Sequence, residues 1–217
     1  MNSAVRVRFR ELHLSGTFVI PNPWDIGSAR MFEDLGFTAL ATTSSGLARS
    51  LGKRDQEVTL DELSRHVEQL VDAVTVPVHV DAERCFADDP DGVALTVERL
   101  AQLGASGISI EDFAPAAGAI DPLGVAADRV RAAAEVAHAH GMLLTARAEN
   151  HLYGAGDLDD TIARVPVNVL LWPGGPTIAE LRSVGVRRIS TGGALADAAY
   201  DAARHAALSL QAQTAPS

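Results

Sequence analysis

The sequence has one cysteine among 217 residues, and no apolar run approaches the roughly 20 residues that a membrane helix requires. A single cysteine, Cys85, cannot form an internal disulfide, so we expect the chain to work in a reducing compartment. Residues 1–16 are basic but lack the apolar stretch of a signal peptide. These absences predict a cytoplasmic protein that does not act at a membrane.

Positive charge is also scarce. The chain has 18 lysines and arginines against 28 aspartates and glutamates, which gives a net charge of −10 and a pI near 5.1. Such a chain repels nucleic acids and anionic membranes, so neither is an expected partner. An anionic substrate would need a local metal ion or an arginine. The sequence also contains no P-loop and no dinucleotide-binding fingerprint.

The chain does contain a regular alternation of short β-rich runs and amphipathic, alanine-rich segments. Hydrophobic residues make up 47% of the sequence, which suits one globular domain over residues 1–217. The β-rich runs predict strands near 17–21, 37–43, 76–81, 106–111, 142–147, 166–172 and 187–191. The other segments predict helices near 25–35, 60–73, 90–103, 122–139, 157–164, 177–184 and 194–212. Apolar strands separated by helices are typical of an α/β fold with a parallel sheet.

Seven strand–helix units result, whereas a TIM-type (β/α)8 barrel has eight and typically takes about 250 residues. The short segment is 150–166, because DLDDTIARV supplies only about two helical turns before PVNVLLW begins. The sequence therefore predicts either an open doubly wound sheet or an incomplete barrel with about seven βα units.

Three of the predicted strands end on charged residues. Asp81 and Glu83 end VPVHVDAE, Glu111 ends SGISIE, and Arg147 lies near the end of LLTARAEN. The carboxyl ends of parallel strands meet at one edge, where α/β enzymes keep their active sites. Crowded carboxylates favour a divalent cation, and oxygen ligands without a Cys/His cluster suit Mg²⁺ or Mn²⁺. For Asp81 with Glu83 alone, a solvated strand end with a helix-capping role is an equal alternative.

Other residues near this edge are weaker candidates. Asp55, in SLGKRDQE, could add an acidic ligand, and the loop 44–52 offers backbone N–H groups to an anion, although such loops are more often simple turns. Arg147 interrupts an apolar strand and needs either a structural carboxylate or a substrate anion as partner. Cys85 is expected at the edge as a partly exposed thiol, without a histidine partner for catalysis. His66 is expected on a helix surface.

In order along the chain, these segments resemble the isocitrate lyase/phosphoenolpyruvate mutase superfamily. The resemblance is greatest to its phosphoenolpyruvate mutase-like or carboxyvinyl-carboxyphosphonate phosphorylmutase-like subgroup. The matching stretches cover most of residues 18–205: PNPWDIGSARMFEDLGF, ATTSSGLARSLGKRD, VPVHVDAE, GISIED, LLTARAEN and VNVLLWPGG…GVRRISTGGALADAAY. The resemblance implies a (β/α)8 barrel with Mg²⁺ (or Mn²⁺) at the carboxyl ends of its strands. It also implies a small 2-oxo or 2-hydroxy carboxylate substrate that reacts through a metal-stabilised enolate.

The resemblance implies roles for individual residues as well. Asp81 corresponds to the direct metal ligand, and the ligands acting through water are Asp55, Glu83 and Glu111. The residues expected to bind substrate are Ser45, Gly46, Leu47 and Arg147, and those expected to be catalytic are Arg147 and Glu111. Family members are commonly tetramers that exchange C-terminal helices, so the helix 194–212 is expected to pack on a neighbouring subunit.

The loops depart from the family pattern. The lyase branch has a K-[KR]-C-G-H loop after the fourth strand, but this chain reads FAPAAGAIDP there, without cysteine, lysine or histidine. The lysine and asparagine of the mutase gating loop are absent from the same place. Cys85 and Ala87 stand where glycines are expected, and about one βα unit is missing after DLDDTIAR.

These observations predict a Mg²⁺-dependent lyase or hydrolase acting on an oxaloacetate-like or phosphonopyruvate-like carboxylate. One alternative is carbon–phosphorus chemistry of the phosphoenolpyruvate/phosphonopyruvate mutase type. The other is a catalytically degenerate paralogue with a structural role.

Overall fold

The computed structural model describes residues 2–149, 168–172 and 174–213, and these contain seven parallel strands in two sheets. One sheet has the order β2–β3–β4–β7, formed by Leu40–Ala41, Val78–Asp81, Gly107–Glu111 and Leu143–Arg147. The other has the order β1–β9–β8, formed by Phe18–Ile20, Arg188–Ser190 and Asn168–Leu170. All seven strands lie inside the predicted ranges.

The two sheets adjoin at β1 and β2, where the Ala41 amide donates to the Pro21 carbonyl at 3.0 Å. From β1 to β7 the parallel strands follow chain order, and the last strand, β9, lies beside the first. This is the order of a (β/α) barrel. A doubly wound sheet would reverse its order at a switch point, so that alternative is wrong. Within the described residues no strand pairing joins β7 to β8, and the predicted helix 157–164 lies outside them.

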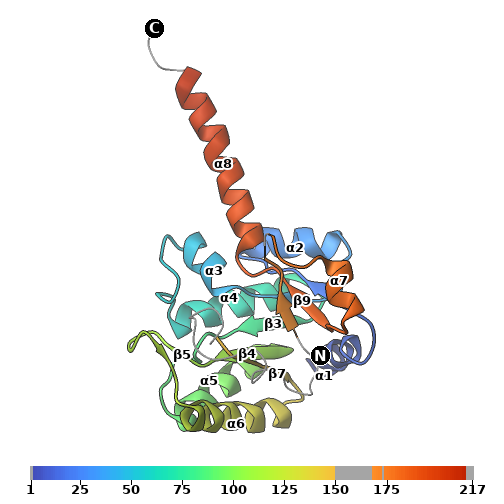
Figure 1. The fold of residues 1–217 in the computed structure, drawn as a ribbon, viewed down its shortest axis with the longest axis vertical. Coiled ribbons are helices and arrows are strands. Elements are labelled where there is room, and N and C mark those ends of the chain that lie inside the picture. The colour runs from blue at the N-terminus through green and yellow to red at the C-terminus, as the bar shows by residue number, and fades with distance from the viewer. Residues whose placement is uncertain (1, 150–167, 173, 214–217) are drawn as a thin grey trace.

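Helices surround the strands (Figure 1). Six predicted helices are confirmed: α2 Ile26–Asp34, α4 Leu60–Ala73, α5 Pro90–Gln102, α6 Leu123–Ala139, α7 Ile178–Ser183 and α8 Ala194–Gln213. Local sequence encodes many of their ends. Asp25, Thr59 and Thr177 cap the N-termini of α2, α4 and α7, and glycines with positive φ follow α2, α5, α6 and α7.

Three elements are absent from the sequence prediction: α1 Asn2–Leu12, α3 Ser44–Ser50, and a hairpin of β5 Phe113–Ala114 and β6 Ala119–Ile120. Tertiary contacts hold α1, since Phe9 is fully buried and Arg6 donates to three backbone carbonyls near the ends of α5 and α6. Small residues conceal the helical period of α3. Short helices depend on such packing more than on propensity, which is why the local pattern did not reveal them.

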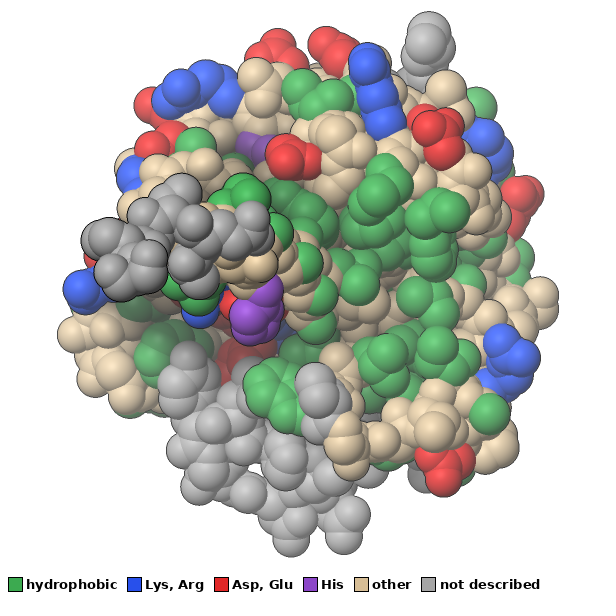
Figure 2. Space-filling model, turned by 90° about the horizontal axis from the view of Figure 1, so that it is seen from above, with side chains coloured by type: hydrophobic (Ala, Val, Ile, Leu, Met, Phe, Trp, Pro, Cys, Tyr) green, Lys and Arg blue, Asp and Glu red, His purple; other side chains and the backbone are tan. Residues whose placement is uncertain are grey.

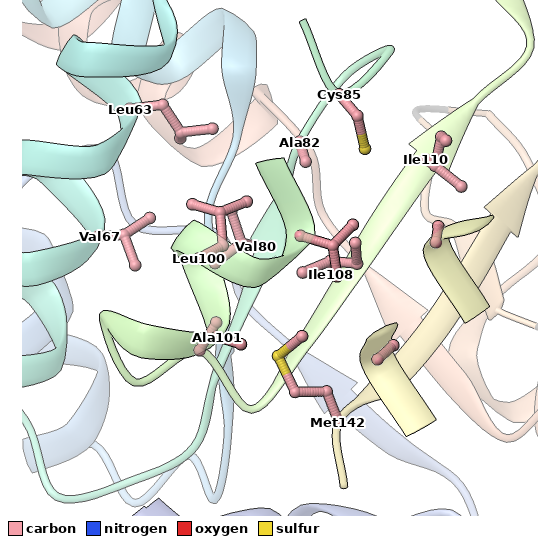
Figure 3. Packing of buried hydrophobic residues seen from close by; sticks show 14 of the residues in the cluster. Leu63, Val67, Val80, Ala82, Cys85, Leu100, Ala101, Ile108, Ile110 and Met142 are labelled. Carbon is pink, nitrogen blue, oxygen red and sulfur yellow. The ribbon is translucent and has the colours of Figure 1, made fainter. Parts of the chain in front are cut away.

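The largest hydrophobic core lies between β3, β4 and the helices α4, α5 and α6 (Figure 3). Val80 and Ile108 pack there with Leu63 and Leu100, and each of these side chains is at most 2% exposed. Burying one such side chain stabilises the fold by about 1.5–3 kcal/mol. Because successive side chains of a strand point to opposite faces, the burial of Val80 turns Asp81 away from this core.

The predictions for two side chains are wrong. His66 is 7% exposed rather than at the surface, because α4 packs this side against the body of the protein. Cys85 is fully buried rather than partly exposed, because its side chain joins the core beneath the edge of the sheet.

The C-terminal helix α8 projects away from the rest of the molecule (Figure 1). Ala196 is buried at its base, whereas residues 197–211 are exposed. Figure 2 views the molecule from the end at which α8 projects, and hydrophobic side chains gather on that face. The helices α2, α7 and α8 carry the exposed residues Ile26, Ile178 and Tyr200, respectively. None of the helices in the described part of the chain combines the length and hydropathy needed to span a membrane.

Candidate active site

The charged residues at the ends of β3, β4 and β7 meet at one edge of the four-stranded sheet. In the strand register Asp81 lies opposite Ser109, and Glu111 lies opposite Arg147. Glu111 is only 5% exposed, and Asp81 is partly buried. The structure thus brings together the three residues that the strand ends singled out.

Arg147 is the centre of the ion pairs. Its Nη1 lies 2.8 Å from Asp81 Oδ1 and 3.2 Å from Glu111 Oε2, and its Nη2 lies 2.7 Å from Glu149 Oε1. Burial alone would lower the pKa of Arg147, but the three carboxylates outweigh it and raise the pKa above its ordinary value. The guanidinium therefore stays charged, and 34% of its side chain remains exposed to an incoming anion.

Donors from neighbouring elements hold Asp81. Ser109 Oγ on β4 donates to its Oδ1 and the Ser44 backbone N–H of α3 donates to its Oδ2, both at 3.2 Å. The Asp81 amide in turn donates to Thr42 Oγ1 at 2.8 Å. The sequence prediction did not name Thr42 or Ser109, and it included Ser44 only as part of the loop 44–52. The signal that it missed is a polar residue directly after β2 and another in the middle of the apolar strand β4, on either side of β3.

Glu83 and Glu111 are buried carboxyls that share the site with other acids. Burial raises the pKa of Glu83 to about 8, and the charges of Asp81, Asp55 and Glu111 act in the same direction. Burial raises the pKa of Glu111 to about 7, although Arg147 opposes this. Near neutral pH Glu83 is therefore mostly protonated and Glu111 is about half protonated, unless a cation joins them.

The loop after β3 has a strained backbone. Glu83, Cys85 and Phe86 have φ angles of +47°, +59° and +54°, in the left-handed region that glycine favours. Such a conformation costs about 1–3 kcal/mol for each non-glycine residue. Of the two positions where the family resemblance leads us to expect glycine, Cys85 therefore has a backbone conformation that favours glycine, and Ala87 does not.

Asp55 lies in the exposed loop before α4, close enough to Glu83 to help raise its pKa. Its neighbour Gln56, which the sequence prediction missed, donates from Nε2 to Glu111 Oε1 at 3.1 Å. A pocket of about 200 Å³ lies beside Glu83, and its lining also includes Gln56, Val58, Arg84, Phe86 and Pro115. This volume is below the range of typical drug-sized pockets, so only a small molecule would fit.

Three of the four predicted substrate-binding residues, Ser45, Gly46 and Leu47, lie in the first turn of α3. Ser45 Oγ is 3.2 Å from Thr43 Oγ1. The Gly46 amide donates to Thr43 Oγ1 at 3.3 Å, and the Leu47 amide donates to the Thr43 carbonyl at 3.0 Å. The Leu47 side chain is buried in the core. The first turn of α3 therefore contacts Asp81 through the Ser44 amide. The amides of Gly46 and Leu47 already donate to the capping residue Thr43.

The donor chemistry suits magnesium or manganese. Within the described ranges, no group of three or more His, Cys, Asp and Glu side chains is arranged to hold a metal ion directly. Mg²⁺ often binds through only one or two carboxylates and keeps several waters. Asp81 would be the direct ligand, and Glu83 and Glu111 are carboxyls whose raised pKa values a cation would lower. The residues present thus fit such an ion.

The family model for phosphoenolpyruvate phosphomutase matches residues 9–165 and 163–211. The chain belongs to the phosphoenolpyruvate phosphomutase family. The two matched segments meet at residues 163–165, in the stretch where the sequence predicts that about one βα unit of the family barrel is missing.

Relatives within this family share most of the chain. An uncharacterized protein of Mycobacterium tuberculosis is 32% identical over 92% of this chain and 87% of its own length. Oxaloacetate decarboxylase of a Bradyrhizobium species is 30% identical over 87% of this chain and 71% of its own length. The crystal structure of a candidate lyase/mutase from Burkholderia cenocepacia matches with a TM-score of 0.90 and 38% identity, over 97% of this chain and 89% of that one. The chain is therefore a member of an enzyme family with lyase-type activities, and it has the α/β fold of that family.

Proposed function

We propose that this protein is a Mg²⁺- or Mn²⁺-dependent lyase or hydrolase that acts on a small 2-oxo dicarboxylate of the oxaloacetate class. The observation that carries the proposal is the placement of Arg147 among Asp81, Glu111 and Glu149 at the carboxyl ends of three parallel strands. A partly exposed cation beside carboxylate oxygens suits a substrate that carries both a carboxylate and a carbonyl oxygen. The oxaloacetate decarboxylase relative supports the same substrate class.

In this proposal the arginine binds the substrate and the carboxyls bind the metal ion. Arg147 would bind the substrate carboxylate and stabilise negative charge that develops on the substrate oxygen, while Glu111 and Glu149 keep its guanidinium in place. Asp81 would hold the metal directly, with Glu83, Glu111 and Asp55 binding its waters. When bound, the metal would supply Lewis-acid stabilisation of an enolate. Ser45, which follows the Asp81 contact Ser44 in α3, would contribute a hydroxyl to the substrate.

The hairpin β5–β6 favours one reaction within this class. It contains no cysteine, lysine, histidine or asparagine, and both of its acidic neighbours have partners. Asp112 Oδ1 accepts from the Glu149 amide, and Asp121 is held in ion pairs with Arg84 and Arg129. The hairpin therefore offers no free side chain to act as a general acid, which disfavours a reaction that needs one from this segment. When oxaloacetate loses the carboxylate that is β to its ketone, carbon dioxide is released and the enolate of pyruvate remains. Water can protonate this enolate to give pyruvate, so the reaction needs no such group. This makes decarboxylation the first reaction to test.

The first test measures pyruvate release from oxaloacetate, with phosphonopyruvate as a second substrate, in Mg²⁺, Mn²⁺ or EDTA. Blanks with metal and no protein remove the reaction that free metal supports. We expect Asp81→Asn and Arg147→Met to lower kcat/KM at least about 100-fold, since loss of one charge-stabilising group typically costs about that much. The matched controls are Asp128→Asn and Arg131→Gln, which break an exposed Asp–Arg pair on α6 and should retain activity.

A binding test separates an inactive paralogue from a wrong choice of substrate. Mg²⁺ with oxalate, an enolate mimic, should raise the melting temperature of the wild type, because a ligand of the folded state stabilises it. Asp81→Asn should abolish this increase. A wild type that shows neither turnover nor a thermal shift would support the catalytically degenerate paralogue, and full activity of Asp81→Asn would refute the metal role.

A further inference from the structure

Arg129 is a buried cation that the proposed reaction does not use. It lies in α6, and its side chain is only 1% exposed. Arginine is seldom fully buried unless its donors have partners. Its recorded hydrogen bonds are with the loop after β3, the end of β4 and the hairpin β5–β6, and none is with Asp81 or Arg147.

One guanidinium joins these three segments. Its Nη2 donates to the carbonyls of Arg84 and Ala87, the latter at 3.1 Å, and these two residues flank Cys85 and Phe86, two of the three left-handed residues of the loop. Its Nη1 donates to the Glu111 carbonyl at 3.4 Å and to Asp121 Oδ2 at 3.0 Å. Strained backbone persists only where its surroundings hold it, and Arg129 is such a support.

Asp121 completes the cluster from the hairpin. Its carboxylate also pairs with Arg84, and Arg84 Nη1 reaches the Phe113 carbonyl at 3.5 Å. The Asp121 amide donates to the Asp112 carbonyl at 2.8 Å, which closes the base of the hairpin. One carboxylate that is 7% exposed therefore serves two guanidinium groups, and it ties both ends of the hairpin to the loop after β3.

The clamped segments carry two carboxyls of the candidate site. The Glu111 amide donates to the Glu83 carbonyl at 3.0 Å, so the loop and the end of β4 are joined directly next to the Arg129 contacts. Lysine could not replace Arg129, because a single ammonium lacks the planar fork that here serves three carbonyls and a carboxylate.

We propose that Arg129, with Asp121, is a positioning residue of the site. It locks residues 83–87, the end of β4 and the hairpin into one unit, and thereby fixes where the Glu83 and Glu111 carboxyls lie. The hairpin is then a fixed wall of the site rather than a moving gate. The inference rests on the proposed function, because that function gives the two carboxyls their role.

The test compares Arg129→Lys and Asp121→Asn with Arg131→Gln as the matched control. Arg131 lies on the same helix, but its side chain is 64% exposed and pairs with Asp128 at the surface. Amide hydrogen exchange is measured in EDTA without substrate. We expect residues 83–87 and 111–121 to exchange at least tenfold faster in both test variants, and at the wild-type rate in the control. Under conditions where the variants are folded, kcat for oxaloacetate should fall at least tenfold, with a smaller change in KM.

Each outcome bears on a different claim. Unchanged exchange in both segments overturns the lock, and faster exchange with wild-type kcat overturns the positioning role. A wild type without turnover contradicts the proposed function instead, and the exchange comparison then still decides whether Arg129 joins the segments. Should Arg129→Lys fail to fold, Asp121→Asn provides both measurements, since it keeps the buried guanidinium.

Discussion

At the scale of single residues, the site combines one shared arginine with an excess of carboxyls. Arg147 balances part of the negative charge of Asp81, Glu111 and Glu149. Glu83 is 6% exposed, and its pKa is raised to about 8. Without a cation, this edge of the sheet therefore keeps protons that the unfolded chain would release at lower pH, and folding becomes sensitive to pH.

The raised pKa values predict that stability falls as pH rises. Between about pH 4.5 and 8 the folded protein holds protons on Glu83 and Glu111 that the unfolded chain loses. Each group lowers the free energy of unfolding by up to about 1.4 kcal/mol per pH unit in its window. In EDTA, Glu83→Gln should therefore melt higher than the wild type at pH 8.5 but not at pH 5.5. Equal effects at both pH values would contradict the prediction, and Mn²⁺ should reduce the difference.

A second prediction concerns the cysteine. Burial raises the pKa of the Cys85 thiol to about 12, and the side chain is fully buried. Because the thiolate is the reactive form, native protein at pH 8 should react with a disulfide reagent such as DTNB only as fast as it opens or unfolds. Unfolded protein in guanidinium should react within seconds. Rapid reaction of the native protein would show that the loop after β3 opens readily.

At the scale of elements, the short helix α3 links the active-site edge to the C-terminal region. Its first residue, Ser44, donates to Asp81, and its Gly46 packs against Trp24 and Ala196. These contacts require close approach of the backbone. A Cβ at position 46 would lie 2.5 Å from Thr43 Cγ2 and 3.1 Å from Trp24 Cβ, so α3 would have to shift.

Gly46→Ala should therefore lower both stability and activity. Replacing glycine by alanine inside a helix ordinarily stabilises by about 0.5–1 kcal/mol, but the clash is expected to outweigh this here. Gly124→Ala is the matched control, because it also lies in a helix and its new Cβ would meet no atom within 4 Å. Thermal unfolding and oxaloacetate turnover of both variants provide the check. A Gly46→Ala protein as stable as the control would show that α3 moves at little cost.

At the scale of the whole molecule, two features concern closure and assembly. Arg188 on β9 donates to Asn168 Oδ1 on β8 at 2.8 Å and to Thr145 Oγ1 on β7 at 2.7 Å. It thus links the two sheets on the side where no strand pairing joins β7 to β8 among the described residues. At the C-terminal end, α8 is a 20-residue helix whose residues 197–211 are exposed to solvent.

We propose that α8 packs on another copy of this chain to form a homo-oligomer. An isolated helix is marginally stable in water, and the exposed Tyr200, Leu208 and Leu210 would gain burial in such contacts. A chain ending at residue 197 should therefore form an assembly of fewer copies than the full chain, measured as the mass in solution divided by the mass of one chain, by light scattering coupled to size exclusion. A chain lacking only residues 214–217 should keep the full number of copies. The same number of copies for all three chains would contradict the proposal.

Much of the fold follows from local sequence. Apolar runs of strand length gave all seven parallel strands, and residues such as Thr177 and Gly185 marked the helix ends, because capping and left-handed turns depend on nearby atoms. The spacing of Asp81, Glu111 and Arg147 placed them at one edge, since parallel strands align their carboxyl ends.

Only the tertiary structure decided the partners of these residues. It placed Gln56 against Glu111, buried Cys85 and His66, folded α1 and α3, and set Arg129 behind the loop after β3. These contacts join segments far apart in the chain, and their free energy comes from burial and from the geometry of hydrogen bonds. The sequence by itself thus determined which charges reach the edge of the sheet, and the packing of distant segments determined which of them touch, because local patterns carry no information about contacts across the fold.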